Sequence, residues 1–194
     1  MKLIPADAMR RMPWKNGGGV TTEIAIAPEG ATLDNFDWRI STAQVDAAGP
    51  FSRFTGFDRS LAVIAGGRLT MHRADGNVIS LAPGEAPVRF PGEVDIHATV
   101  DAPLSDFNVM TRRDTWVHHA EPITLAAGER RSLPTTRARM QWVVYCVHGA
   151  LSLDGADVSL SQGAAVWLDA PSGNDTLVAR VGSVGYLVAL WPVA

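Results

Sequence analysis

Short apolar runs recur along the whole chain, and two of the longest alternate apolar and polar residues with a period of two. These two runs are TTEIAIA (21–27) and WRISTAQV (38–45). A period of two is typical of a β-strand with one buried face. Further short apolar runs have the composition of strands: 61–66, 68–72, 78–81, 107–110, 140–147, 150–153, 158–160, 164–168, 176–181 and 186–191.

Turn signals separate these runs at short intervals. They are pairs ending in glycine: Asp75-Gly76, Pro83-Gly84, Pro91-Gly92, Asp154-Gly155 and Ser172-Gly173. Short strands with a turn about every 8–12 residues indicate a β-sandwich or barrel. The 18 glycines and 12 prolines also argue against long helices. The sequence predicts an all-β protein with very little helix, limited to about one turn near residues 6–11.

Part of the pattern occurs twice. The segment 61–92 matches 143–171: each has an apolar strand, a glycine, a second strand, an Asp-Gly turn, a third strand, a glycine and a further apolar strand. We expect the following equivalent positions: Gly67 with Gly149, Asp75-Gly76 with Asp154-Gly155, and Gly84 with Gly163. This order is that of a cupin, a jelly-roll barrel. The repeat therefore predicts a bicupin, with two tandem jelly-roll barrels at residues 1–113 and 114–194.

Charge and cysteine content narrow the class of protein. The net charge is −3, and the basic pairs Arg112-Arg113 and Arg130-Arg131 are isolated, so we expect no nucleic-acid partner. The N-terminal segment has no apolar signal region, and the apolar tail from Val181 is too short and interrupted to span a bilayer. With one cysteine, Cys146, no internal disulfide can form. We expect a cytoplasmic protein without a membrane partner.

The histidines do not have the spacing of a metal centre. Catalytic cupins typically hold a transition metal with two histidines and a glutamate from one strand region and a third histidine from a later one. This chain has no His-x-His pair followed closely by glutamate; its histidines are His72, His97, His118, His119 and His148. We expect no metal and no other cofactor.

Polar residues interrupt the strands mainly before residue 114. WKNGGGVTTEI (14–24) places three glycines after Lys15 and Asn16. The glycines could form a nest of N–H groups for an anion, or a flexible turn that only needs positive φ angles. In the strand that follows, alternation puts Glu23 on one face with Thr21 and Ala25. Arg39 and Ser41 share one face of the next strand. If both strands line a barrel, Glu23 and Arg39 point inward and need each other or a charged ligand.

Aromatic residues accompany the next polar positions. GPFSRFTGFDRSL (49–61) contains three phenylalanines and the pair Asp58-Arg59, which is either a turn-fixing ion pair or a ligand clamp. Glu93 follows a Pro-Gly turn, and Asn108 lies on a strand beside Phe107. Aromatic rings beside a few polar groups are typical of a small-molecule pocket, although each phenylalanine alone is more often core. The second copy has few such polar positions, so the first barrel is expected to carry the site.

Four blocks in the first half resemble the HutD/Ves family of bicupin proteins: WKNGGGVTTEI, WRISTAQVDAAGPFSRFTGFDRSL, PVRFPGE and DFNVMTRR. The second half resembles the family only in pattern, and Thr55 departs from the expected proline. The resemblance implies a cytoplasmic accessory or regulatory protein of histidine utilisation without established catalysis. It implies binding of a small carboxylate such as urocanate or N-formylglutamate. The implied ligand residues are Lys15, Asn16, Gly18, Glu23, Arg39, Ser41, Phe54, Arg59, Glu93, Phe107 and Asn108.

Other functions stay open on the sequence. A metal-independent enzyme acting on a histidine-degradation intermediate would use Glu93 or Glu23 as general acid or base, since an apolar barrel can raise a carboxyl pKa. A metallo-cupin enzyme is a third hypothesis. Exposed strand edges make a homodimer a further expectation.

Overall fold

The computed structural model describes residues 1–15 and 17–193, so Asn16 of the expected ligand set lies outside the described residues. Within this part the only helical element is one 3₁₀ turn, η1 (Ala6–Ala8), and the prediction of an all-β protein with very little helix is confirmed. The strands are β1 (Lys2–Ile4), β2 (Arg10–Pro13), β3 (Gly19–Ala27), β4 (Trp38–Val45), β5 (Gly49–Pro50), β6 (Phe57–Gly66), β7 (Leu69–Arg73), β8 (Val78–Leu81), β9 (Val88–Pro91), β10 (Ile96–Val100), β11 (Leu104–Arg112), β12 (Trp116–Leu125), β13 (Arg130–Ser132), β14 (Gln141–His148), β15 (Ala150–Leu153), β16 (Ser159–Ser161), β17 (Ala165–Leu168), β18 (Thr176–Ala179) and β19 (Ser183–Pro192).

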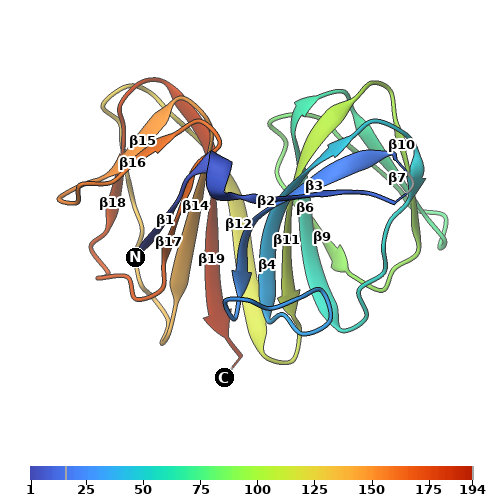
Figure 1. Cartoon of the computed structure of the whole chain (residues 1–194), viewed down its shortest axis with the longest axis horizontal. Coiled ribbons are helices and arrows are strands. Elements are labelled where there is room, and N and C mark those ends of the chain that lie inside the picture. The colour runs from blue at the N-terminus through green and yellow to red at the C-terminus, as the bar shows by residue number, and fades with distance from the viewer. Residues whose placement is uncertain (16, 194) are drawn as a thin grey trace. The chain divides into compact units, whose positions relative to one another are not determined.

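The chain forms two compact units. The first unit is Arg10–Trp116, and the second combines Met1–Met9 with Val117–Ala194. The expected units are residues 1–113 and 114–194; in the structure residues 1–9 belong to the second unit and residues 114–116 to the first. Residues 1–9 belong to the second unit because β1 pairs antiparallel with β17, as Figure 1 shows near the N-terminus.

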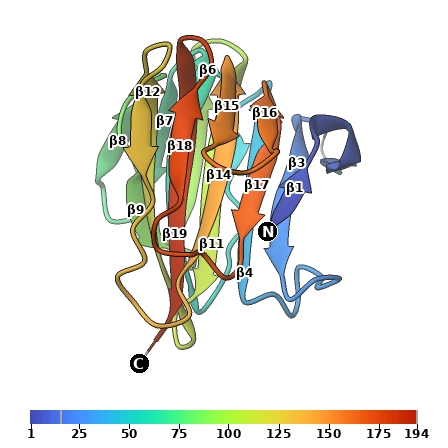
Figure 2. The same ribbon diagram turned by 90° about the vertical axis from the view of Figure 1, so that its left-hand side faces the viewer.

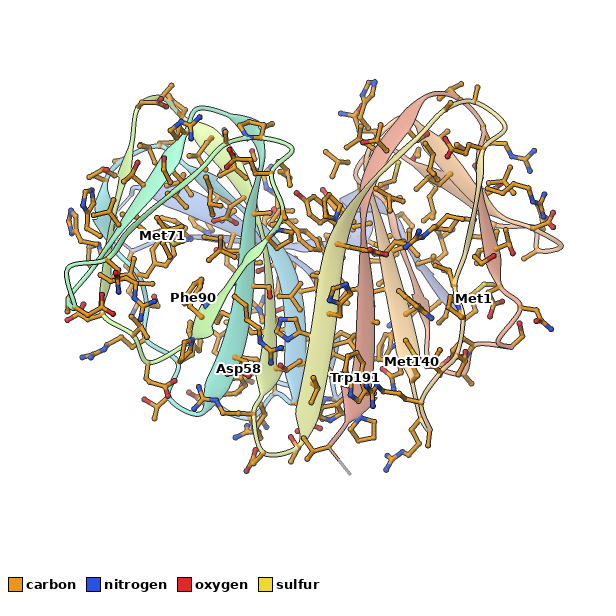
Figure 3. All side chains as sticks on the ribbon, turned by 180° about the vertical axis from the view of Figure 1, so that it is seen from behind. Met1, Asp58, Met71, Phe90, Met140 and Trp191 are labelled. Carbon is orange, nitrogen blue, oxygen red and sulfur yellow. The ribbon has the colours of Figure 1, made fainter. Side chains whose placement is uncertain are left out.

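Two antiparallel sheets build the first unit. One has the strand order β2-β3-β4-β11-β6-β9 and the other β5-β10-β7-β8. Their inward faces share one apolar core, to which the first sheet contributes Leu61, Val63 and Phe90 and the second sheet Leu69, Met71 and Ile96. Figure 3 shows Phe90 and Met71 in the interior of this unit. The face of the six-stranded sheet that points toward this core is called the inner face below.

The second unit repeats the two-sheet plan. Its sheets have the orders β1-β17-β14-β19-β12 and β13-β18-β15-β16. Figure 2 shows β19, β14, β17 and β1 following one another across the first of these sheets. The core between the two sheets is apolar and includes Trp142, Val144, Leu151, Leu177 and Leu187.

The glycine equivalent to Gly149 is Gly66, not Gly67 as the repeat predicted. Gly66 and Gly149 have φ angles of 88° and 89°. Each also passes close to a neighbouring backbone: an added Cβ would lie 2.4 Å from the Pro103 carbonyl oxygen at Gly66 and 2.5 Å from that of Gly182 at Gly149. Only glycine fits such a position without strain. The repeat pattern predicts Gly67 because Gly66 and Gly67 are consecutive and the sequence alone does not distinguish them.

A β-bulge changes which residues of β3 face the core. Glu23 pairs with Ser41, but after a register shift Ile26 pairs with Arg39. Alternation from Glu23 had placed Ala25 on the same face, and this expectation is wrong because the bulge inserts one unpaired residue. Glu23 and Ile26 therefore share the inner face of the sheet with Arg39 and Ser41.

Candidate functional site

The polar residues of the first unit lie on the inner face in three cross-strand rows. In the first row Met110 of β11 lies between Arg39 of β4 and Arg59 of β6. In the second row Asn108 lies between Ser41 and Leu61, and Ser41 also pairs with Glu23. In the third row Asp106 lies between Ala43 and Val63. Five strands thus bring these side chains together, since Phe90 of β9 pairs with Arg59.

Glu23 and Arg39 form a buried ion pair. Arg39 Nε donates to Glu23 Oε2 over 2.7 Å, and the side chain of Arg39 is only 6% exposed and that of Glu23 14%. Both side chains point inward, and of the two alternatives left open by the sequence, each other or a charged ligand, the structure shows that they pair with each other. Two charges at this depth repay their desolvation only by such close geometry.

Arg59 is a buried cation without a carboxylate partner. The residue is 7% exposed, and none of the carboxylates described in the structure lies within 4.0 Å of its guanidinium. Its donors reach the Asn108 Oδ1 at 3.4 and 3.5 Å and the Ser52 carbonyl oxygen at 3.2 Å. Burial, together with the positive charge of Arg39, lowers the pKa of Arg59 to about 10, although Asp106 opposes the shift.

Three phenylalanine rings surround the Arg59 guanidinium. Its Cζ lies 5.3 Å from the ring centre of Phe51, 5.7 Å from that of Phe54 and 5.1 Å from that of Phe90. Contacts of this length stabilise a desolvated guanidinium through the negative face of the ring. Phe54 also packs edge-on against Phe36 and Phe57, so it is both part of the small aromatic core and part of this cage.

Two more polar groups face the same space with unused capacity. The Ser41 hydroxyl and the Asn108 amide nitrogen make no hydrogen bond to any described residue, and both residues are buried. Both atoms keep some contact with solvent, since neither is among the fully buried side-chain atoms of the described residues that lack a hydrogen-bond partner. Together with Arg59 they offer several hydrogen-bond donors to an acceptor between β4, β11 and β6.

Asp106 is a site residue that the sequence analysis missed. It is 6% exposed, and its Oδ1 accepts the Ala43 N–H over 3.0 Å. Burial raises the pKa of Asp106 to about 7, and Arg59 and the Ala43 N–H reduce the rise. The period of two contained the signal, because Asp106 lies two positions before Asn108 on the same strand.

Glu93 lies at the rim and not in the cluster. Its carboxylate, 39% exposed, accepts two hydrogen bonds of 2.9 Å from Arg113, which also donates to Asp58. Hydrogen bonding to Arg113 lowers the pKa of Glu93, so the raised carboxyl pKa expected for a general acid is found at Asp106 and not here. Asp58 and Arg59 form neither a pair nor a joint clamp, because consecutive strand residues face opposite sides and Asp58 pairs with Arg89 and Arg113. Figure 3 places Asp58 nearer one end of the unit than Phe90.

Three other expected ligand residues also lie apart from the cluster. Lys15 is exposed, and Gly18 belongs to the tight turn between β2 and β3, in which Gly17 N–H donates to the Trp14 carbonyl. This turn leads to Gly19, which pairs with Val45 of β4. Val45 lies six residues from Arg39 on the same strand, so the turn is roughly 20 Å from Arg39. Phe107 lies on the face of β11 opposite to Asn108. The structure thus brings together Glu23, Arg39, Ser41, Phe54, Arg59 and Asn108.

The second unit has no comparable polar rows. An added Cβ would meet Leu104 Cα at Gly66 and Ser183 Cα at the equivalent Gly149. Positions 79 residues apart in β11 and β19 are therefore equivalent, and Leu187 stands where Asn108 stands in the first unit. Asn108 pairs with Leu61, and Arg59 lies two residues before Leu61. Leu187 pairs with Val144, and Trp142 lies two residues before Val144. Trp142 is therefore equivalent to Arg59. Trp142 and Leu187 both belong to the apolar core. The cluster is therefore a property of the first unit, as the uneven distribution of polar residues predicts.

Neither a metal-ligand cluster nor a membrane-spanning helix occurs in the described residues. Residues 1–15 and 17–193 contain no group of three or more His, Cys, Asp or Glu side chains placed to hold a metal ion. In the same residues we find no helix with the length and hydropathy needed to cross a membrane. Of the histidines, His72 and His97 are exposed cross-strand neighbours, and His118 is buried.

Comparison with known structures supports the fold. The chain matches the crystal structure of PA5104 from Pseudomonas aeruginosa PAO1, a conserved protein of unknown function, with a TM-score of 0.85 and 26% identity over 97% of both chains. It matches HutD from Pseudomonas fluorescens SBW25, determined in a formate condition, with a TM-score of 0.79 and 26% identity over 100% of this chain and 99% of that one. The bacterial pirin YhhW from Escherichia coli, in complex with nickel(II), shares the cupin-like fold alone, with a TM-score of 0.75 and 13% identity over 99% of both chains.

Sequence comparison identifies the family. "Protein Ves" of Citrobacter koseri is 32% identical over 169 residues, which are 83% of this chain and 81% of that protein. An uncharacterized 21.2 kDa protein from the hutC 3′ region of Pseudomonas putida is 37% identical over 112 residues, 57% of each chain. The HutD family model matches residues 6–185. These matches confirm the resemblance seen in the four sequence blocks, and the chain belongs to the HutD family.

Proposed function

We propose that the first unit binds a small carboxylate and that the protein is a cytoplasmic accessory or regulatory component of histidine utilisation. In this proposal each unit is a cupin barrel, the first carries the ligand site, and the second supports it. The observation that carries the proposal is Arg59, a buried guanidinium with no described carboxylate within 4.0 Å.

The charges of the site favour an anion. Glu23 already neutralises Arg39, whereas Arg59 has only neutral oxygen acceptors within hydrogen-bond distance. A buried charge without a counter-ion is costly, and a carboxylate ligand would remove this cost. The planar guanidinium presents its donors in a fork that matches the two oxygens of a carboxylate.

The surroundings of Arg59 suit the rest of a small organic acid. Phe51, Phe54 and Phe90 offer ring surface for an imidazole or an acyl chain. The Ser41 hydroxyl and the Asn108 amide add hydrogen-bonding groups, and Glu23 could accept a ligand N–H. Urocanate and N-formylglutamate combine a carboxylate with such groups. The location of a relative in the hutC 3′ region supports ligands from this pathway.

The test is a calorimetric and thermal-shift panel with formate, urocanate and N-formylglutamate. At 100 times its dissociation constant, a ligand of one site should stabilise the protein by about 2.7 kcal/mol. Arg59→Met should abolish the shift. Arg113→Met, which removes an arginine that is already paired with Glu93 and Asp58, should preserve it. The absence of a shift with every carboxylate would refute the proposal.

A metal-independent enzyme is the weaker alternative. Glu93 is held ionised by Arg113 and lies apart from the cluster, which does not favour a general-acid role. The expected homodimer stays a prediction, to be checked by the molar mass in solution.

A further inference from the structure

Asp106 is an acidic group enclosed by apolar residues. Its cross-strand neighbours are Ala43 and Val63, and both belong to the apolar core of the first unit. The Ala43 N–H is its single hydrogen-bond donor among the described residues, and no described cation lies within 4.0 Å. A carboxylate in such surroundings is poorly solvated, so burial favours the neutral acid.

Among the described residues, Asp106 and Arg59 are the two buried charges of the inner face that form no ion pair. Asn108 lies between them: it is two residues from Asp106 on β11, and its Oδ1 accepts from Arg59. At this separation each stabilises the charged form of the other without direct contact. An anion placed on Arg59 offsets the positive potential that Arg59 produces at Asp106. Asp106 then becomes harder to ionise.

We propose that a carboxylate binds at Arg59 together with a proton from solvent, which Asp106 takes up. This inference rests on the proposed function and adds a residue that does not touch the ligand. The charges balance: before binding, Arg39 and Arg59 are offset by Glu23 and Asp106. After binding, the carboxylate group held by Arg59 replaces Asp106 as the second negative charge of the inner face, and the neutral Asp106 retains its hydrogen bond from the Ala43 N–H.

No other charged group that the structure describes near Asp106 would be neutralised by a ligand bound at Arg59. Besides Asp106, the charged side chains on the inner face are Arg10 of β2, Glu23 of β3, Arg39 of β4 and Arg59 of β6. Glu23 and Arg39 neutralise each other, and Arg10 is exposed on the edge strand, three strands away from Asp106. From β9, Phe90 faces the core. The opposite sheet presents apolar residues, namely Leu69, Met71, Leu81, Ile96 and Ala98. The histidines of that sheet, His72 and His97, are exposed on its outer side.

The experiment is calorimetry of N-formylglutamate binding to the full chain at pH 6, 7 and 8, in two buffers of different ionisation enthalpy. This ligand has no group that titrates near pH 7, unlike the imidazole of urocanate. Since the pKa of Asp106 is about 7 in the free protein, complete coupling gives uptake of about half a proton at pH 7. Affinity should then fall about fivefold from pH 7 to pH 8.

Asp106→Asn is the decisive variant, because its side-chain oxygen can still accept the Ala43 N–H while the charge is absent. It should bind without proton uptake, with an affinity independent of pH and, at pH 8, tighter than that of the wild type. Glu93→Gln is the matched control at the exposed rim and should keep the wild-type profile. The proton count of the wild type needs no variant, so a folding defect in Asp106→Asn does not remove the test.

The outcomes separate the two proposals. Binding without proton uptake in the wild type, or uptake that persists in Asp106→Asn, overturns the role of Asp106 and leaves the carboxylate site in place. If the wild type binds none of formate, urocanate and N-formylglutamate at all three pH values, the proposed function and this inference are both overturned.

Discussion

Removing one partner of the Glu23–Arg39 pair should destabilise the first unit more than removing both. Glu23→Gln preserves shape but leaves the Arg39 guanidinium buried without a counter-ion, and Arg39→Met does the reverse to Glu23. The pair is joined over 2.7 Å with side chains 14% and 6% exposed. Breaking such a buried pair typically costs about 3–5 kcal/mol. We expect about 3 kcal/mol for each single variant, the lower end, because Glu23 retains some contact with solvent.

The double variant should be more stable than either single variant. With both charges gone, no buried ion is left uncompensated, and replacement of a buried pair by neutral side chains is often nearly neutral. This non-additivity is the signature of a direct interaction and is measured by a double-mutant cycle. If the losses in unfolding free energy of the two single variants instead add up in the double variant, the two residues act separately.

Urea unfolding measures the cycle. Far-ultraviolet circular dichroism and tryptophan fluorescence are followed together, and unfolding free energies are compared where the two transitions coincide. Arg113→Met is the control, because it breaks exposed pairs with Asp58 and Glu93 and should cost at most about 1 kcal/mol. Losses below about 1 kcal/mol in both single variants would refute the assignment of a costly buried pair.

Three further predictions use other parts of the first unit. The pKa of Asp106 is about 7 in the folded protein, against 3.8 ordinarily, so the folded state binds the carboxyl proton more tightly than the unfolded state does. The protonated Asp106 therefore contributes fully to the free energy of unfolding below pH 4. This contribution is lost as the pH rises through 7, and the loss amounts to about 4 kcal/mol. Asp106→Asn should lack this loss in urea titrations, and an unchanged pH profile would contradict the assignment. Gly19→Ala should lower the melting temperature by several degrees, since the new Cβ would lie 2.2 Å from the Gln44 carbonyl oxygen; wild-type thermal stability would show that the backbone yields there. Arg59→Lys keeps the charge but loses the donor fork and should weaken carboxylate binding about tenfold by calorimetry, whereas equal affinity would mean that charge alone is recognised.

The strands were predictable because local sequence determines them. Alternation in WRISTAQV placed Arg39 and Ser41 on one face, and the structure agrees because β4 is regular. The same rule failed in β3, where the unpaired residue of a bulge leaves no mark in the apolar pattern. It would also have separated Phe107 from Asn108 if it had been applied to β11, since neighbours in a strand face opposite sides.

The composition of the site was harder to predict than its strands. Glu23 and Arg39 meet because β3 and β4 are adjacent, and strand adjacency could be guessed from chain order. The partners of Glu93 could not: Arg113 follows it by 20 residues and reaches it from beyond the end of β11. Depth of burial, which separates Asp106 from Glu93 and sets the direction of their pKa shifts, depends on the packing of two whole sheets. No single segment contains that information.

The pairing of β1 with β17 has a consequence for biosynthesis. Ile4 pairs with Ala165, so the strand made first must wait for a partner that emerges from the ribosome roughly 10 to 30 s later at ordinary rates of bacterial synthesis. The first unit is continuous in sequence and its strands are all made by residue 112. Nascent chains arrested once Trp116 has emerged from the ribosome should therefore already contain a protease-resistant Arg10–Trp116 segment, while residues 1–9 are still cleavable. Protection of residues 1–9 from the protease would then show that the second unit, whose other residues lie at the C-terminal end of the chain, is complete.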